Sequence, residues 1–142
     1  MNWNKLLDQG IVQPVKFSKT TEDDLLKLVE RDILDAQVEE LSPDRKFAIA
    51  YSAALNLARV AVFKAGYRIR AKAGHHRASF DAAEVAIGNQ VKPLCDYFDY
   101  ARKQRNKVDY DFVEVVSEDE MNELMQNVFE FKKVVLDFLS RK

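Results

Sequence analysis

The chain has 142 residues, of which 47% are hydrophobic, and its formal net charge is −1. This length and apolar fraction suit one domain, residues 1–142, with one continuous core. The charge gives no general attraction to nucleic acid or to an anionic membrane, and no run approaches the roughly 20 apolar residues of a membrane span. Cys95 is the single cysteine, which excludes an internal disulfide and suits the cytoplasm. Its apolar neighbours predict a buried thiol.

Residues 1–19 predict an irregular N-terminal arm, because Gly10 and Pro14 interrupt any helical period. The arm is too apolar for a free tail, so we expect it to pack on the domain or on a second subunit. A first helix is expected from about Thr21, with a threonine cap and acids in its first turn, to about Leu41.

The second helix has the clearest boundaries. Ser42 followed by Pro43 predicts an N-cap and a first helical residue, and the helix should continue to about Ala65, where Gly66 ends it. Its many alanines indicate a central helix that neighbours approach closely. Residues 67–74 predict a polar, basic connection.

Three more segments complete the predicted fold. A short third helix is expected over about 75–87, and a fourth from about Val91 until a connection over 109–116. Ser117 and Glu120 have the spacing of a capping box, which predicts that the last helix begins there. The pattern predicts an all-α fold: an antiparallel bundle of about five helices with a four-helix up-down core.

Charge is distributed unevenly along the chain. Residues 45–80 contain eight Lys or Arg and no acid, whereas residues 22–40 contain eight acids and two bases, and residues 109–123 contain seven acids and no base. One interpretation is complementarity between neighbouring elements or subunits. The other is a basic surface for a polyanion.

Polar side chains gather near the end of the expected fourth helix. Arg105 and Asn106 lie three and four positions after Arg102, so both can share one side of a helix with it, and Lys107 adds another cation. Two guanidinium groups beside an amide suit a phosphodiester, because Arg binds phosphate in a planar, bidentate way. The alternative is a solvated helix end in which aspartates such as Asp99 pair with these cations.

His76 and Arg77, at the start of the expected third helix, form a second candidate phosphate-binding group within the acid-free segment. His75 and His76 are adjacent, so they point about 100° apart on a helix and are poorly placed to bind one metal ion together. A capping or packing role is the alternative for either histidine. We expect neither a metal nor a cofactor.

The stretch Asp99–Asp111, DYARKQRNKVDYD, resembles the signature helix of HEPN domains (higher eukaryotes and prokaryotes nucleotide-binding), which are small helical bundles. Residues 52–67 and 74–80 are similar to prokaryotic members, so the resemblance covers about residues 20–140. It implies either a dimeric, metal-independent ribonuclease, often the toxin of a toxin–antitoxin pair, or a non-catalytic partner of a small nucleotidyltransferase.

The HEPN catalytic motif is Arg, a polar residue, about three further residues and then His. Arg105 and Asn106 match the first two places, and Tyr110 stands where the histidine is expected. In such a ribonuclease the arginine steadies the phosphate while the histidine transfers a proton. Tyrosine, with an ordinary pKa of about 10, is a poor base at neutral pH. The resemblance therefore implies a degenerate catalytic motif and favours phosphate binding over cleavage.

The expected function is that of a HEPN-like protein that binds RNA or nucleotide phosphate as a homodimer, with an antitoxin or nucleotidyltransferase as possible protein partner. The alternative is a non-catalytic homodimeric interaction module, or the partner of a minimal nucleotidyltransferase. A metal-dependent bundle enzyme is disfavoured, because its Glu-x-x-His pattern does not occur in the sequence.

Overall fold

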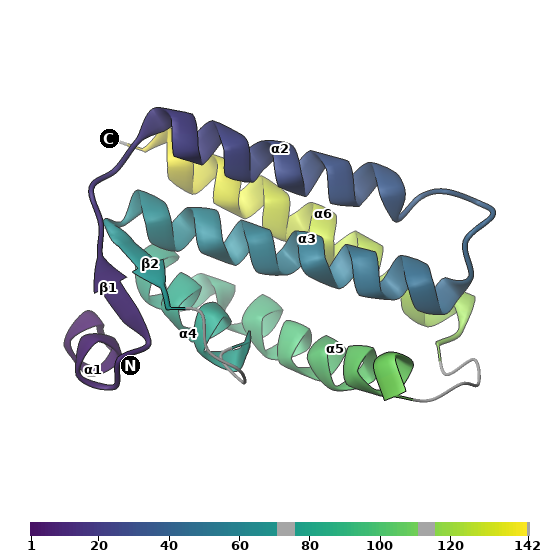
Figure 1. Cartoon of the computed structure of the whole chain (residues 1–142). Helices are drawn as coiled ribbons and strands as arrows, with labels where there is room; N and C mark the ends of the chain where they lie inside the picture. Colours follow the sequence, from purple (N-terminus) through teal and green to yellow (C-terminus); the bar gives the residue numbers. More distant parts are fainter. Residues whose placement is uncertain (71–75, 111–115, 142) are drawn as a thin grey trace.

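A computed structural model describes residues 1–70, 76–110 and 116–141, with the backbone alone for 105–110. It is a helical bundle of six packed helices with a small two-stranded sheet (Figure 1). In chain order the elements are α1 (Trp3–Asp8), β1 (Val12–Pro14), α2 (Lys19–Asp35), α3 (Pro43–Lys64), β2 (Tyr67–Ile69), α4 (His76–Ile87), the 3₁₀ turn η1 (Asn89–Val91), α5 (Lys92–Tyr110) and α6 (Glu118–Ser140). In Figure 1, α2 and α5 run one way and α3 and α6 run the other. The predicted helical bundle is confirmed.

The central helix is α3, which packs against α2, α4, α5 and α6. Ser42 caps it by accepting a hydrogen bond from the Arg45 backbone N–H at 3.3 Å, with Pro43 in the first turn. At its other end Gly66 adopts φ +97°, a left-handed conformation that glycine adopts without strain. Both predicted ends of this helix are confirmed to within a residue.

The helix α2 differs from its prediction at both ends. Ser18, rather than a threonine, caps it by accepting from the Thr21 N–H at 3.3 Å. The helix ends at Asp35 instead of near Leu41. The Gln37 side chain donates a hydrogen bond to the Ile33 carbonyl at 3.0 Å. This carbonyl lies in the last turn of the helix, where carbonyl groups have no hydrogen-bond donor within the helix.

The N-terminal arm is more regular than its glycine and proline predict. Asn2 caps the short helix α1, and β1 pairs antiparallel with β2, so Val12 lies opposite Ile69. The backbone bonds from Val15 N–H to Gly66 O, 3.0 Å, and from Arg70 N–H to Ile11 O, 2.8 Å, extend this pairing. The prediction of an irregular arm is therefore wrong, and so is the prediction that residues 67–69 belong to a connection. Each of these two segments forms a strand only by pairing with the other.

Side chains fasten the arm to the bundle. Leu6 and Val12 are buried in a small cluster with Val62 of α3 and with α4. The indole of Trp3 stacks on the ring of Tyr67 of β2, with 4.2 Å between ring centroids. The expectation that the arm packs on the domain is confirmed.

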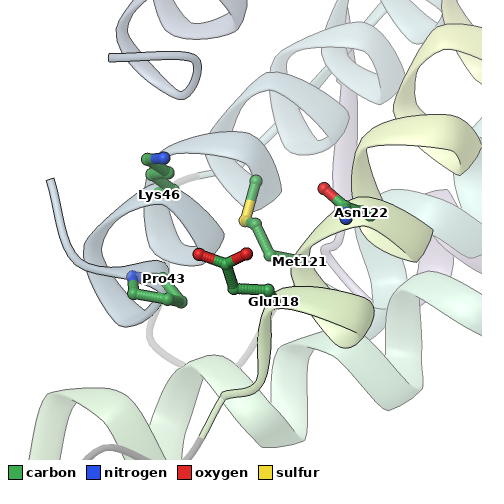
Figure 2. Close-up of a pocket in the computed structure, with 5 residues that line it drawn as sticks. All are labelled: Pro43, Lys46, Glu118, Met121 and Asn122. Carbon is green, nitrogen blue, oxygen red and sulfur yellow. The ribbon is translucent and has the colours of Figure 1, made fainter. Parts of the chain in front are cut away.

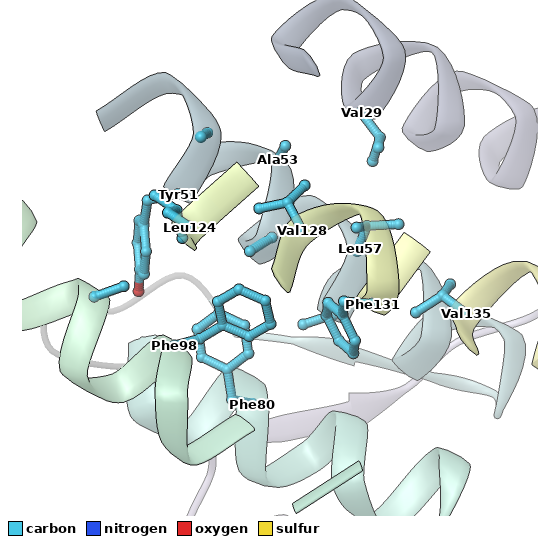
Figure 3. Close-up of a cluster of buried hydrophobic side chains, with 14 of the residues drawn as sticks. Val29, Tyr51, Ala53, Leu57, Phe80, Phe98, Leu124, Val128, Phe131 and Val135 are labelled. Atoms are coloured by element: carbon cyan, nitrogen blue, oxygen red, sulfur yellow. The ribbon is translucent and has the colours of Figure 1, made fainter. Parts of the chain in front are cut away.

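Aromatic rings join three helices in the main core. Phe80 of α4, Phe98 of α5 and Phe131 of α6 are fully buried and lie together (Figure 3). The ring centroids of Phe80 and Phe98 are 5.3 Å apart, and those of Phe98 and Phe131 are 5.2 Å apart. This contact places α4 beside α5 and so positions the polar residues on their outer surfaces.

The last helix, α6, begins as predicted. The Ser117 hydroxyl accepts from the Glu120 N–H at 3.1 Å, and the Glu120 carboxylate accepts from the Ser117 N–H at 3.3 Å. This reciprocal pair is the capping box. One face of α6 is buried in the core, as its apolar period predicts.

Of the described helices, α3 has the length and composition of a membrane span, with a mean hydropathy of 1.3 over its most apolar 18 residues. Other helices bury 67% of that window. Helices that are apolar on every side are found in protein cores as well as in membranes, and α3 occupies the centre of this bundle.

Candidate phosphate-binding site

The outer surface formed by α4 and α5 carries a network of opposite charges. Arg77, in the first turn of α4, lies 3.2 Å from Asp81 one turn further along the same helix. It also crosses to α5, where its guanidinium is 3.2 Å from Asp96 and 3.6 Å from Asp99. The predicted phosphate-binding residue Arg77 thus links the two helices through carboxylates.

Asp99 is shared by three cations. The Arg102 guanidinium places both Nε and Nη2 3.1 Å from Asp99 Oδ1, and Lys103 Nζ lies 3.9 Å from Asp99 Oδ2. Arg77 is the third partner. Because Arg77 also contacts Asp81 and Asp96, and Lys92 contacts Asp96, four cations face three carboxylates among the described side chains here, which leaves an excess of one positive charge on this surface.

Asp96 occupies the neighbouring turn of α5. A hydrogen bond from Lys92 at 3.1 Å lowers the pKa of its carboxyl group; desolvation opposes this shift, and a further hydrogen bond from Arg77 adds to it. The side chains of Lys92, Arg77 and Asp96 are all exposed to solvent, so these ion pairs contribute little to stability. Pairs this weak can exchange a carboxylate for a phosphate oxygen.

His76 packs rather than projecting freely from the bundle. Its ring lies over that of the buried Tyr51 on α3, with 5.7 Å between centroids. The packing role, which was the alternative for this histidine, is thus observed. Its contact with phosphate stays a prediction. His75 lies outside the described residues.

The predicted catalytic residues Arg105, Asn106 and Tyr110, with Lys107, lie in the last turns of α5, where the backbone alone is described. The helix extends to Tyr110 and so covers the first two residues of the predicted connection 109–116. No glycine or proline follows Pro93 in α5 to end the helix earlier. Positions 106 and 110 are four apart and share one side of the helix, whereas 105 and 110 are about 140° apart.

A small cavity of about 80 Å³ lies between the first turns of α3 and α6, which the sequence did not predict (Figure 2). Lys46 and Glu118 both line it. Because these side chains carry opposite charges, the cavity has no preference for an anion. Within the described ranges, no three His, Cys, Asp or Glu side chains are grouped closely enough to bind a metal ion.

Comparison of the chain with protein-family models, with curated proteins and with solved structures gives no match. The class that the fold defines is therefore a helical bundle. The similarity to HEPN domains rests on the sequence motifs alone and stays a prediction.

Proposed function

We propose that this chain is a cytoplasmic HEPN-like protein that binds RNA or nucleotide phosphate along α5, as the toxin or ribonuclease-like component of a toxin–antitoxin system. The observation that carries the proposal is the excess of cations on this helix. On α5, Arg102 and Lys103 share the single carboxylate of Asp99, which also contacts Arg77 of α4. The motif beginning at Arg105 follows on the next turn of the same helix.

The chemistry of these side chains suits phosphate. Arg102 contacts Asp99 through two of its nitrogens, so the guanidinium keeps further N–H donors for a ligand oxygen. Arg105 adds a second permanent cation, and Lys107 a third. Binding is proposed in preference to cleavage, because Tyr110 replaces the general base of the HEPN motif.

The test measures the affinity of the purified protein for a fluorescently labelled single-stranded RNA at low salt. Arg105→Ala is expected to weaken binding at least tenfold, or by about 1.4 kcal/mol. Affinity should also fall steeply with added salt, as it does when phosphates release counterions.

The matched control is Arg141→Ala, which removes the same charge at the far end of α6, where Arg141 pairs with Asp137. This variant should bind RNA like the wild type. Equal RNA affinity of the folded Arg105→Ala variant and the wild type would refute the assignment.

A second candidate function is a homodimeric interaction module without catalysis, or the partner of a minimal nucleotidyltransferase. It is favoured by the apolar side chains exposed on α2 and α6: Leu34 is 68% exposed, Phe129 46% and Leu136 41%. Sedimentation of wild type and Phe129→Asp, with and without RNA, separates the two functions. A dimer that Phe129→Asp dissociates, in a protein without RNA affinity, would favour the interaction module.

A further inference from the structure

A second cavity lies at the opposite end of the bundle from the last turn of α5. It has a volume of about 340 Å³ and lies between α2, α3 and β2, which meet at the left of Figure 1. Its walls include the apolar side chains of Leu25, Phe63 and Ile69. Cavities of this size, mostly apolar with a few polar groups, are typical of small-molecule sites.

The polar groups of this cavity have a single sign of charge. Arg59 of α3 and Arg68 of β2 both line it, and its lining includes no carboxylate. Among the described residues neither arginine forms an ion pair with Asp or Glu, in contrast to Arg77 and Arg102 on the α4–α5 surface. Two guanidinium groups from different elements therefore border one apolar cavity, without a carboxylate to neutralise them.

Arg59 is an exposed residue, and its guanidinium donates a hydrogen bond to a buried polar pair. Asn56 donates through Nδ2 to Asp32 at 3.1 Å, which leaves its Oδ1 to accept from Arg59 Nη1 at 3.3 Å. Asp32 is 6% exposed and Asn56 is 7% exposed. Burying a carboxylate and an amide is costly unless both are hydrogen-bonded, and here the bonded chain ends on the guanidinium that borders the cavity. Because Asn56 is neutral, the positive charge of Arg59 stays available to a ligand.

We propose that this cavity binds a small amphipathic anion. Its carboxylate or phosphate head would lie between Arg59 and Arg68, and its apolar body would cover Leu25, Phe63 and Ile69. The guanidinium groups supply charge and bidentate hydrogen bonds to the head, while the walls favour burial of the body. The site is separate from α5, so it does not depend on RNA binding there.

Calorimetric titration with four probes tests whether binding needs both the charged head and the apolar body of the ligand. Decanoate and decyl phosphate, used below their micelle concentrations, carry a head and an apolar body, whereas decanol lacks the charge and inorganic phosphate lacks the body. At least one of the two amphipathic anions is expected to bind one per chain, at least tenfold more tightly than decanol and inorganic phosphate. Comparison of decanoate with decyl phosphate identifies the preferred head.

Arg59→Gln and Arg68→Gln are each expected to weaken binding of the preferred probe at least tenfold. Arg45→Gln is the matched control, because Arg45 is an exposed arginine in the first turn of α3, far from the cavity. It should bind within twofold of wild type, and thermal unfolding is used to confirm that every variant is folded. Equal affinity for decanol and the preferred anion, unchanged affinity in both glutamine variants, or no binding of either amphipathic anion would overturn the proposal.

Discussion

Cys95 lies on the buried side of α5 and is 1% exposed. Burial, reinforced by the nearby carboxylate of Glu84, raises the pKa of its thiol to about 12. The thiolate is the reactive form of cysteine, so the folded protein keeps this side chain unreactive at neutral and mildly alkaline pH.

We predict that Cys95 reacts with Ellman's reagent at pH 8.5 only when the chain unfolds. In the unfolded state the thiol recovers an ordinary pKa, and a large part of it ionises at this pH. The labelling rate in increasing urea should follow the unfolding transition measured by circular dichroism. Rapid, complete labelling in the absence of urea would contradict the buried position of the thiol.

Arginine partners decide which positive charges are available to a ligand. Arg77 stands in an acid-free stretch of sequence, which made it a candidate for phosphate, yet Asp96 and Asp99 reach it from the next helix. These ion pairs form because α4 packs on α5, so they could not be predicted from the residues next to Arg77 in the sequence. The charge of Arg59, in contrast, stays available, since its guanidinium donates a hydrogen bond to the neutral amide of Asn56.

At the scale of elements, the start of α6 is determined by local chemistry. Ser117 and Glu120 exchange hydrogen bonds with each other's backbone, and they pair donors that no residue within the helix can satisfy. The same kind of local pattern, a serine followed by proline, determines the start of α3. These boundaries could be predicted because each depends on residues at most three positions apart in the sequence.

We predict that Ser117→Ala lowers the free energy of unfolding by about 1 kcal/mol, the usual cost of losing a serine N-cap. Urea denaturation monitored by circular dichroism measures this change. Ser140→Ala is the matched control, because Ser140 ends the same helix and its hydroxyl donates to the nearby Asp137 carbonyl rather than capping the start of the helix. An equal loss in both variants would argue against a special role for the capping box.

The sheet shows where local prediction fails. Residues 12–14 and 67–69 are each too short and too irregular to indicate a strand, and they pair across the whole of α2 and α3. Strand pairing depends on a partner as well as on the segment itself. The cavity beside β2 escaped prediction for the same reason, because its two arginines come from separate elements.

At the scale of the whole molecule, α3 and the aromatic cluster hold the helices together. The helix α3 packs against the four other long helices, while Phe80, Phe98 and Phe131 join α4, α5 and α6 beneath it (Figure 3). The sequence predicted the bundle because apolar residues recur with helical period on α3 and α6. It did not place α4 beside α5, which depends on these ring contacts.

We predict that Phe131→Ala lowers the free energy of unfolding by about 3–5 kcal/mol, because it opens a cavity where three helices meet. Phe129→Ala is the matched control on the same helix. Its side chain is 46% exposed, so the loss should stay below about 1.5 kcal/mol. Chemical denaturation of both variants provides the comparison, and similar losses would contradict the central position of Phe131.

The pairing of β1 with β2 has a consequence for synthesis on the ribosome. The arm leaves the exit tunnel before its partner strand, so β1 cannot form this pair until α3 has been made and Tyr67–Ile69 have emerged. Trp3 likewise waits for Tyr67. The arm therefore reaches its folded position only after β2 has been made, and its apolar side chains stay accessible to chaperones until then.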